Sequence, residues 1–254
     1  FWMSRITKEW KFALRYVIFF PFEVVRLALY FRREKFTFIY AGGGSWQYKG
    51  VIAGKLAGIK VLWHLNDTSI PFIFRTLFGL LSKYADGFVF ASERSRQYYG
   101  SLIKQKKNEF VIPAPVDTKT FDQVQKYKGD EVLLESWQGK IVIGVVANIN
   151  PVKGLETLIQ VAAKLNQQFD NLVFTVVGPI FSSQKRYFEQ LHNICRYQSV
   201  NNIYFVGGRS EIRPFLNRFN IYVCCSLAES SPIAVWEAMS MGKAIVSTDV
   251  GDVP

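Results

Sequence analysis

The feature that most constrains this chain is a regular alternation of short apolar runs and helical patterns, which begins at Phe36. Short runs rich in Val, Ile and Phe predict strands, and apolar residues recurring every three or four positions predict helices. Strands are expected at 36–40, 60–65, 87–91, 110–112, 140–147, 172–177, 203–206, 221–225 and 244–247. Helices are expected at 49–57, 70–84, 93–102, 155–169, 183–197, 211–219 and 232–241. Such alternation favours right-handed βαβ units and therefore an α/β fold with parallel sheets.

The alternation stops between Asp117 and Gly139, where the sequence is polar, mixed in charge and bounded by prolines. Such a segment is typical of a connection between domains. We therefore predict two doubly wound α/β domains, over 36–116 and 140–254, with 117–139 as the connection between them.

Residues 1–35 are expected to be a helical segment of the N-terminal domain. Large apolar side chains predominate in 12–31, but Arg15 and Arg26 interrupt them, and the uncharged run Tyr16–Phe22 is shorter than the about 20 apolar residues that span a bilayer. No signal-peptide cleavage site follows. Two interpretations stay open: an amphipathic helix or helix pair packed on the domain, or a basic, aromatic helix resting on an anionic membrane.

The charge balance favours anionic partners. Lys and Arg number 31 against 20 Asp and Glu, which gives a net charge of +11. No nucleic-acid recognition motif is present, so we predict no nucleic-acid partner. The 3 cysteines and 2 histidines have no disulfide-framework or metal-ligand spacing, and the predicted compartment is the cytoplasm.

Two strand-to-helix loops carry groups suited to a ligand, because open parallel sheets bind ligands beyond the carboxyl ends of their strands. In the loop Asn148–Gly154, Lys153 sits where the chain enters a helix. Backbone N–H groups and the positive end of the helix dipole favour an anion there, and a lysine beside them suits a diphosphate. The alternative is an ordinary loop lysine before a capping glycine.

The second loop enters a helix with Ser231 as the expected N-cap and Pro232 at the first helical position. Backbone N–H groups that follow Pro232 are then available to an anion. Glu229 and Glu237 would repel a phosphate at this place, so we expect them to accept hydrogen bonds from sugar hydroxyls instead. The alternative is a capped surface helix with two solvated glutamates.

A continuous set of motifs runs through Lys140–Pro254, and it includes two glutamates in the pattern Glu229-x7-Glu237. Its other members are Val145–Leu155, Val176–Gly178, Val206–Gly207, Ser226 and Ala238–Pro254. This set resembles the second domain of the family 4 glycosyltransferases. The resemblance implies the GT-B fold, in which an N-terminal acceptor domain and a C-terminal donor domain are both Rossmann-like, and it implies retention of configuration at the transferred sugar.

The resemblance also implies a role for each residue. Lys153 would bind the donor diphosphate, Glu237 the ribose and Glu229 the donor sugar. Backbone groups at Ser231, Pro232 and Ile233 would complete the phosphate cradle. The resemblance implies no cofactor and no metal, since lysine and backbone N–H groups neutralise the charge, and the sequence contains no Asp-x-Asp.

One family feature is missing from the donor half. Members often carry an arginine near the diphosphate-binding lysine, and here Asn148 and Asn150 occupy the corresponding places. Stabilisation of the leaving group would then depend more on Lys153, or on another basic residue such as Arg209.

The N-terminal half resembles the family more loosely. Leu62–Asp67 resembles the acceptor-domain strand whose histidine, here His64, faces the donor sugar, although a lone histidine is as often structural. Val116–Phe121 resembles the interdomain Val-Asp-x-x-x-Phe, in which Asp117 is expected to be structural. The family's first strand with its glycine-rich loop and its last strand are not found, so we expect both domains to be incomplete and this part of the protein to be inactive alone.

The leading functional hypothesis is a metal-independent, retaining glycosyltransferase. It would move a sugar from a nucleotide-diphosphate donor to a glycan or lipid-linked acceptor in cell-surface polysaccharide biosynthesis, in the cytoplasm or peripherally at the inner membrane face. Two alternatives stay open: a nucleotide-sugar epimerase or phosphorylase on the same fold, and a non-catalytic nucleotide-sugar-binding protein.

Overall fold

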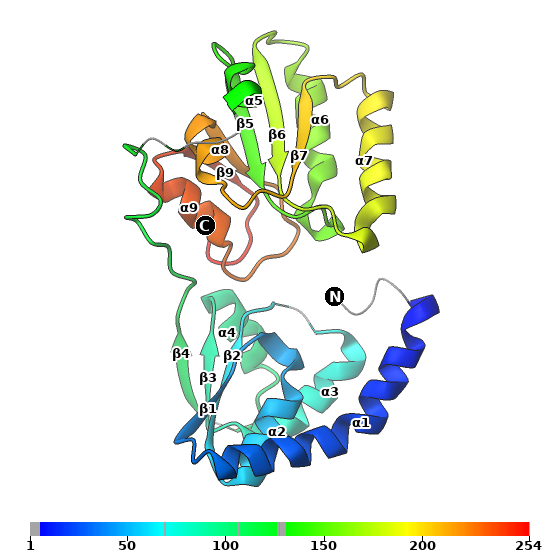
Figure 1. The fold of residues 1–254 in the computed structure, drawn as a ribbon, viewed down its shortest axis with the longest axis vertical. Helices are drawn as coiled ribbons and strands as arrows, with labels where there is room; N and C mark the ends of the chain where they lie inside the picture. Colours follow the sequence, from blue (N-terminus) through cyan, green and yellow to red (C-terminus); the bar gives the residue numbers. More distant parts are fainter. Residues whose placement is uncertain (1–5, 69, 106, 126, 128–130, 254) are drawn as a thin grey trace. The chain divides into compact units, whose positions relative to one another are not determined.

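A computed structural model describes residues 6–68, 70–105, 107–125, 127 and 131–253 of the chain. The chain divides into two compact units, each built around its own sheet (Figure 1). The N-terminal unit runs to Ala114 and also includes Glu229–Ser231, whereas the C-terminal unit runs from Pro115 to Ala228 and resumes at Pro232.

The N-terminal unit contains a parallel sheet of order β1-β2-β3-β4. Its core is aromatic, with Trp63, Phe78, Phe88 and Tyr99 fully buried. The strands are β1 (Phe38–Ala41), β2 (Lys60–Leu65), β3 (Gly87–Phe90) and β4 (Asn108–Val111), and the helices after them are α2 (Tyr48–Ala57), α3 (Phe72–Leu81) and α4 (Glu93–Gly100).

The segment that precedes this sheet forms one helix, α1 (Ile6–Arg33), which continues through Pro21. Val24 and Ala28 of α1 are buried with Ala53 of α2, so one face of α1 packs on the domain. The expected packing is confirmed, whereas the helix-pair alternative is wrong, because loss of one N–H at a proline does not end a helix held by tertiary contacts. None of the described helices combines the length and the apolar character needed to cross a membrane.

The C-terminal unit contains a parallel sheet of order β7-β6-β5-β8-β9. Read from β5, this is the 3-2-1-4-5 order of a Rossmann-type sheet. The strands are β5 (Ile141–Val146), β6 (Leu172–Val177), β7 (Ile203–Gly207), β8 (Ile221–Cys224) and β9 (Ala244–Ser247). The helices are α5 (Glu131–Glu135), α6 (Leu155–Leu165), α7 (Lys185–Tyr197), α8 (Arg213–Arg218) and α9 (Ile233–Ser240).

Helices cover both faces of this second sheet. Ile143 and Val145 of β5 are buried in a core with α6 and α7. Val142, on the same strand, is buried in a second core with α8 and α9 (Figure 1). Two parallel sheets with flanking helices confirm the predicted α/β class. Because the central strands β5 and β6 are buried on both faces, they are continuous apolar runs, which is the pattern that identified them in the sequence.

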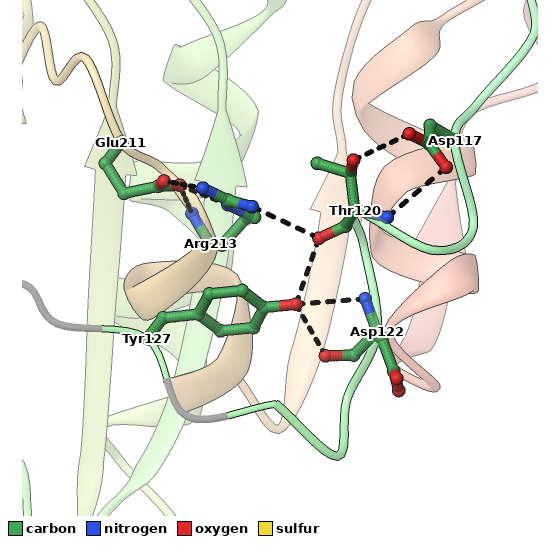
Figure 2. A network of polar contacts seen from close by, with 6 residues as sticks. All are labelled: Asp117, Thr120, Asp122, Tyr127, Glu211 and Arg213. Carbon is green, nitrogen blue, oxygen red and sulfur yellow. Dashed lines mark hydrogen bonds and ion pairs between the residues drawn. The ribbon is translucent and has the colours of Figure 1, made fainter.

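The segment expected to connect the domains, 117–139, is counted with the C-terminal unit, and polar contacts hold it there (Figure 2). The Tyr127 hydroxyl accepts a hydrogen bond from the Asp122 N–H at 3.1 Å and lies 3.0 Å from the Thr120 carbonyl oxygen. Arg213 lies 4.9 Å from the Tyr127 ring, donates to the same Thr120 carbonyl, and is held by the Glu211 carboxylate at 2.7 Å.

Asp117 begins this segment and has a local structural role. Its carboxylate accepts hydrogen bonds from the Thr120 hydroxyl at 2.6 Å and the Lys119 N–H at 2.9 Å, and these contacts lower its pKa. The short helix α5, which the sequence did not predict, follows, and after it Trp137 is fully buried in the core of the C-terminal unit.

Trp137 provides a test of whether this segment is part of the folded unit. We expect Trp137→Ala to lower the free energy of unfolding by about 3–5 kcal/mol, because it empties a fully buried site. Urea unfolding of the full-length protein measures the change. Tyr197→Ala, at a ring that is 91% exposed, is the control and should change stability little. Equal effects of the two substitutions would mean that the Trp137 segment does not belong to the core.

Candidate functional site

The C-terminal sheet has one position where ligand binding is expected from topology alone. Between β5 and β8 the strand order reverses direction, and in such sheets ligands bind beyond the carboxyl ends of the two strands at this point. The loops that follow these two strands are those of Lys153 and of Pro232, which the sequence had singled out independently.

Backbone contacts tie these two loops together. The Leu227 N–H donates to the Val152 carbonyl at 2.8 Å. Gly154 has φ +60°, and a Cβ atom there would lie 2.1 Å from the Cys225 carbonyl oxygen. A side chain at this position would force the loops apart, so glycine is required for their close approach.

Lys153 is the last residue of a short 3-10 turn, Pro151–Lys153, and lies directly before the start of α6. The Asn150 side chain caps this turn by accepting from the Val152 N–H at 3.0 Å. Asn150 therefore orders the loop that carries Lys153, and Lys153 and Asn148 are both half-buried. Lys153 thus belongs to the turn that leads into the positive end of α6, a position that favours anions.

The start of α9 differs from the prediction in its cap. The helix begins at Ile233, and Pro232 is its N-cap, with an extended ψ of 91° and no side-chain cap. The expected Ser231 cap is wrong, because the Ser231 hydroxyl instead accepts from the Ala114 N–H at 3.1 Å within the N-terminal unit. The first turn of α9 thus keeps its backbone N–H groups without a capping side chain, as an anion site requires.

The two predicted glutamates lie in different units. Glu237 is half-buried within α9, and burial raises the pKa of its carboxyl above the usual value. Glu229 is counted with the N-terminal unit, where its carbonyl oxygen accepts from the Thr68 hydroxyl at 3.3 Å.

Arg209 follows the edge strand β7 rather than a strand at the order reversal. Its guanidinium donates to the Val206 carbonyl at 2.8 Å and to the Gly208 carbonyl at 3.3 Å, and it lies 5.8 Å from the Phe215 ring. These contacts hold the guanidinium at its own loop.

His64 lies on β2 in the N-terminal unit, and its ring is fixed by a neighbour on β1. The Tyr40 hydroxyl lies 2.7 Å from Nδ1, while Nε2 is buried and has no hydrogen-bond partner among the described residues. Burial lowers the pKa of the imidazole, so the ring is neutral at neutral pH.

Asp67 holds the loop after β1 in place, a role that sequence reasoning did not identify. The Asp67 carboxylate accepts from the Ser45 hydroxyl at 2.8 Å and from the Ser45 N–H at 3.2 Å, and the Tyr99 hydroxyl also donates to it. Asp67 therefore fixes the loop that follows β1. The glycine triplet before Ser45 was the available signal, because it marks a loop held close to another group.

Comparison with known proteins shows what the chain is similar to. Residues 130–254 match the model of a family described as "Glycosyl transferases group 1". The chain is similar to N,N'-diacetylbacillosaminyl-diphospho-undecaprenol alpha-1,3-N-acetylgalactosaminyltransferase of Campylobacter jejuni, with 23% identity over 90% of this chain and 64% of that protein. It is also similar to the GPI3 subunit of the phosphatidylinositol N-acetylglucosaminyltransferase of Saccharomyces cerevisiae, with 22% identity over 93% and 53%.

Among solved structures, Anabaena HepE in complex with UDP superimposes with a TM-score of 0.77 at 20% identity, over 90% of this chain and 63% of that one. This similarity shows the GT-B fold, two parallel-sheet domains of Rossmann type. Residues 130–254 are thus similar to the group 1 glycosyl transferases, and the chain shares the fold of HepE. The chain spans 64% and 53% of the length of these two curated relatives.

Among the residues that the structure describes, no three His, Cys, Asp or Glu side chains are grouped to hold a metal ion.

The buried carboxyl of Glu237 gives a pH-dependent prediction. Its raised pKa means that the folded state binds this proton more tightly than the unfolded state, so ionised Glu237 lowers stability at neutral pH. We expect Glu237→Gln to raise the free energy of unfolding at neutral pH. The gain should shrink as pH falls through the raised pKa, because the wild-type carboxyl is then protonated.

Urea unfolding of both proteins over a pH series checks this expectation. Glu189→Gln on the exposed surface of α7 is the matched control, since its neutralisation relieves no burial. If Glu237→Gln were less stable than the wild type at neutral pH, the carboxylate would stabilise the protein. The interpretation that its burial lowers stability would then be wrong.

Proposed function

We propose that the protein is a glycosyltransferase whose C-terminal unit binds the diphosphate of a nucleotide sugar where its strand order reverses. The observation that carries the proposal is the close contact between the backbones of two loops. The Leu227 N–H donates to the Val152 carbonyl, and Gly154 lies against the Cys225 carbonyl. This contact brings a lysine at the start of α6 close to the loop that leads to α9. Two helix starts and a lysine at one crevice suit a doubly charged anion.

Each group has a distinct task in this proposal. Lys153 and the first N–H groups of α9, from Ile233 onward, hold the diphosphate and stabilise it as it leaves. Glu237 accepts hydrogen bonds from the ribose hydroxyls, and Glu229 holds the donor sugar. In the transfer step the bond between the anomeric carbon and the diphosphate oxygen breaks. A bond to an acceptor hydroxyl oxygen forms, and the proton of that hydroxyl passes to the departing diphosphate oxygen.

Metal independence and retention belong to the same proposal. Charge neutralisation by a lysine and by fixed N–H groups replaces a divalent cation, because preorganised donors aimed at the leaving oxygens supply the needed stabilisation. Retention is inferred from the family resemblance of Val145–Leu155 and Glu229–Glu237 and rests on no separate geometric observation.

The donor and acceptor classes are inferred from similar proteins. HepE structures contain UDP, and one contains UDP-glucose, so we propose a UDP-sugar donor. The names of two relatives specify a lipid-linked diphosphate and phosphatidylinositol as acceptors. We therefore propose a lipid-linked acceptor in cell-surface polysaccharide assembly on the cytoplasmic side of the membrane, with His64 facing the donor sugar.

Lys153 provides the direct test. In the full-length protein we expect Lys153→Ala to lower turnover by roughly 10²–10³, because it removes a preorganised donor to the leaving group. Lys164→Ala is the matched control, since Lys164 is exposed in the last turn of the same helix and should leave turnover unchanged. Near-normal turnover in Lys153→Ala would remove this residue from the leaving-group contact.

A screen of nucleoside diphosphates by thermal shift establishes the base, and UDP is expected to give the largest rise in Tm. Donor consumption is then measured with and without lipid-linked acceptors. Consumption only with an acceptor supports transfer. Isomerisation or phosphorolysis of the donor without an acceptor, or nucleotide binding without turnover, would replace the proposal with one of its alternatives.

A further inference from the structure

Tyr40 and His64 lie on neighbouring strands of the N-terminal sheet, on the same face of it. In the parallel register Tyr40 of β1 pairs with Leu62 of β2, and His64 follows Leu62 by two positions. Side chains two positions apart on a strand point to the same face, so Tyr40 and His64 are diagonal neighbours. Their ring centroids are 5.6 Å apart, and the Tyr40 hydroxyl lies 2.7 Å from Nδ1 of His64. The register of the two strands thus sets this contact.

Gly42 leaves room for the Tyr40 ring. A Cβ atom at position 42 would lie 3.2 Å from Cε1 of Tyr40, which is closer than most side chains approach. The Tyr40 ring therefore lies against the backbone that follows β1 toward the carboxyl end of the sheet. In this direction the hydroxyl passes Leu62, the partner of Tyr40 in the register, and reaches His64.

The contact decides where the proton of the neutral His64 ring lies. A neutral imidazole carries one proton, so either Nδ1 donates to the tyrosine oxygen or the hydroxyl donates to Nδ1. Hydroxyl donors form shorter hydrogen bonds than N–H donors, and the separation of 2.7 Å agrees with a hydroxyl donor. An unprotonated imidazole nitrogen is also a better acceptor than a phenolic oxygen. The geometry therefore favours donation by Tyr40, which leaves the ring proton on Nε2.

We propose that Tyr40 is a positioning residue, which donates a hydrogen bond to Nδ1 of His64 and so fixes the tautomer with its proton on Nε2. The Nε2–H group then donates to an oxygen of the donor sugar. This ligand rests on the proposed function, in which His64 faces the donor sugar. Tyr40 itself does not touch the sugar and acts only through the His64 ring.

This pairing limits what His64 can do chemically. A carboxylate at Nδ1 would accept from the ring and favour its charged form, whereas a hydroxyl that donates to Nδ1 favours the neutral form. With Nδ1 occupied and Nε2 protonated, the ring has no lone pair left to take a proton from the acceptor hydroxyl. His64 is then a neutral hydrogen-bond donor and not a general base, which agrees with passage of that proton to the departing diphosphate oxygen.

Nitrogen-15 NMR of the full-length protein with labelled histidine reads the tautomer and needs no substrate. The signals of His64 are identified by their loss in His64→Ala. At neutral pH we expect the shift of a protonated nitrogen for Nε2 and that of an unprotonated nitrogen for Nδ1. In Tyr40→Phe the Nδ1 signal should move, because its hydrogen-bond donor is gone. The signals of His192, which packs against Phe188 and Phe205 in the other unit, should stay unchanged.

A double-mutant cycle shows whether Tyr40 acts through His64. We expect Tyr40→Phe to raise the dissociation constant for UDP-glucose about twofold to tenfold, the effect of one hydrogen bond between neutral groups. Binding of UDP, which lacks the donor sugar, should be unchanged. In the His64→Ala background the same substitution should have little effect, because the ring that it positions is absent. Tyr197→Phe, at a ring that is 91% exposed, is the matched control and should change neither constant.

The possible results separate this proposal from the proposed function. A proton on Nδ1 in the wild type, or an Nδ1 signal that does not move in Tyr40→Phe, would overturn the fixed tautomer. An equal effect of Tyr40→Phe with and without His64, or a loss of UDP binding, would show that Tyr40 acts on the fold. If the wild type bound neither UDP nor UDP-glucose, the proposed function and the sugar ligand of Nε2 would both fail, whereas the NMR result would still decide the tautomer.

Discussion

The candidate donor site depends on how closely the backbone packs at the carboxyl ends of the central strands of the second sheet. A Cβ atom at Gly178 would lie 2.0 Å from the Ala147 carbonyl oxygen, so this position admits only glycine. Hydrogen bonds from Ala147 to Val177 and from Ile149 to Pro179 extend the pairing of β5 and β6 beyond the regular sheet. This packing sets where the loop of Lys153 leaves the sheet.

A second constraint is the electrostatic balance at the same crevice. The starts of α6 and α9 present N–H groups and a positive dipole end, which attract an anion but remain uncompensated without one. Glu237 lies in the second turn of α9, where it is half-buried, and burial raises the pKa of its carboxyl. In the proposed function, a ligand with both negative charge and hydroxyl groups would meet the helix starts and Glu237 together.

Sequence reasoning recovered the elements whose signals are local. Strands 60–65, 172–177 and 244–247 agree with the structure at both ends, because each is an apolar run bounded by turn residues. The parallel pairing and the two ligand loops also followed from the alternation. The resemblance supplied functional roles that geometry alone leaves open.

The differences arise where distant contacts decide the local conformation. Ser231 has the composition of an N-cap, but its hydroxyl is used by the Ala114 N–H, more than a hundred residues away in the sequence. Likewise, the polar composition of 117–139 does not predict that Trp137 is buried in the C-terminal core or that Tyr127 binds backbone groups of the same segment; the connection between the domains stays a prediction. A local sequence pattern predicts none of these contacts.

The N-terminal unit shows how such a distant contact can specify chemistry. If the Tyr40 hydroxyl donates to Nδ1 of His64, the single proton of the neutral ring must lie on Nε2. That atom is buried and has no hydrogen-bond partner among the described residues. In this arrangement the contact with Tyr40, on a neighbouring strand, decides which ring nitrogen of His64 carries the proton, and no local sequence pattern shows that contact.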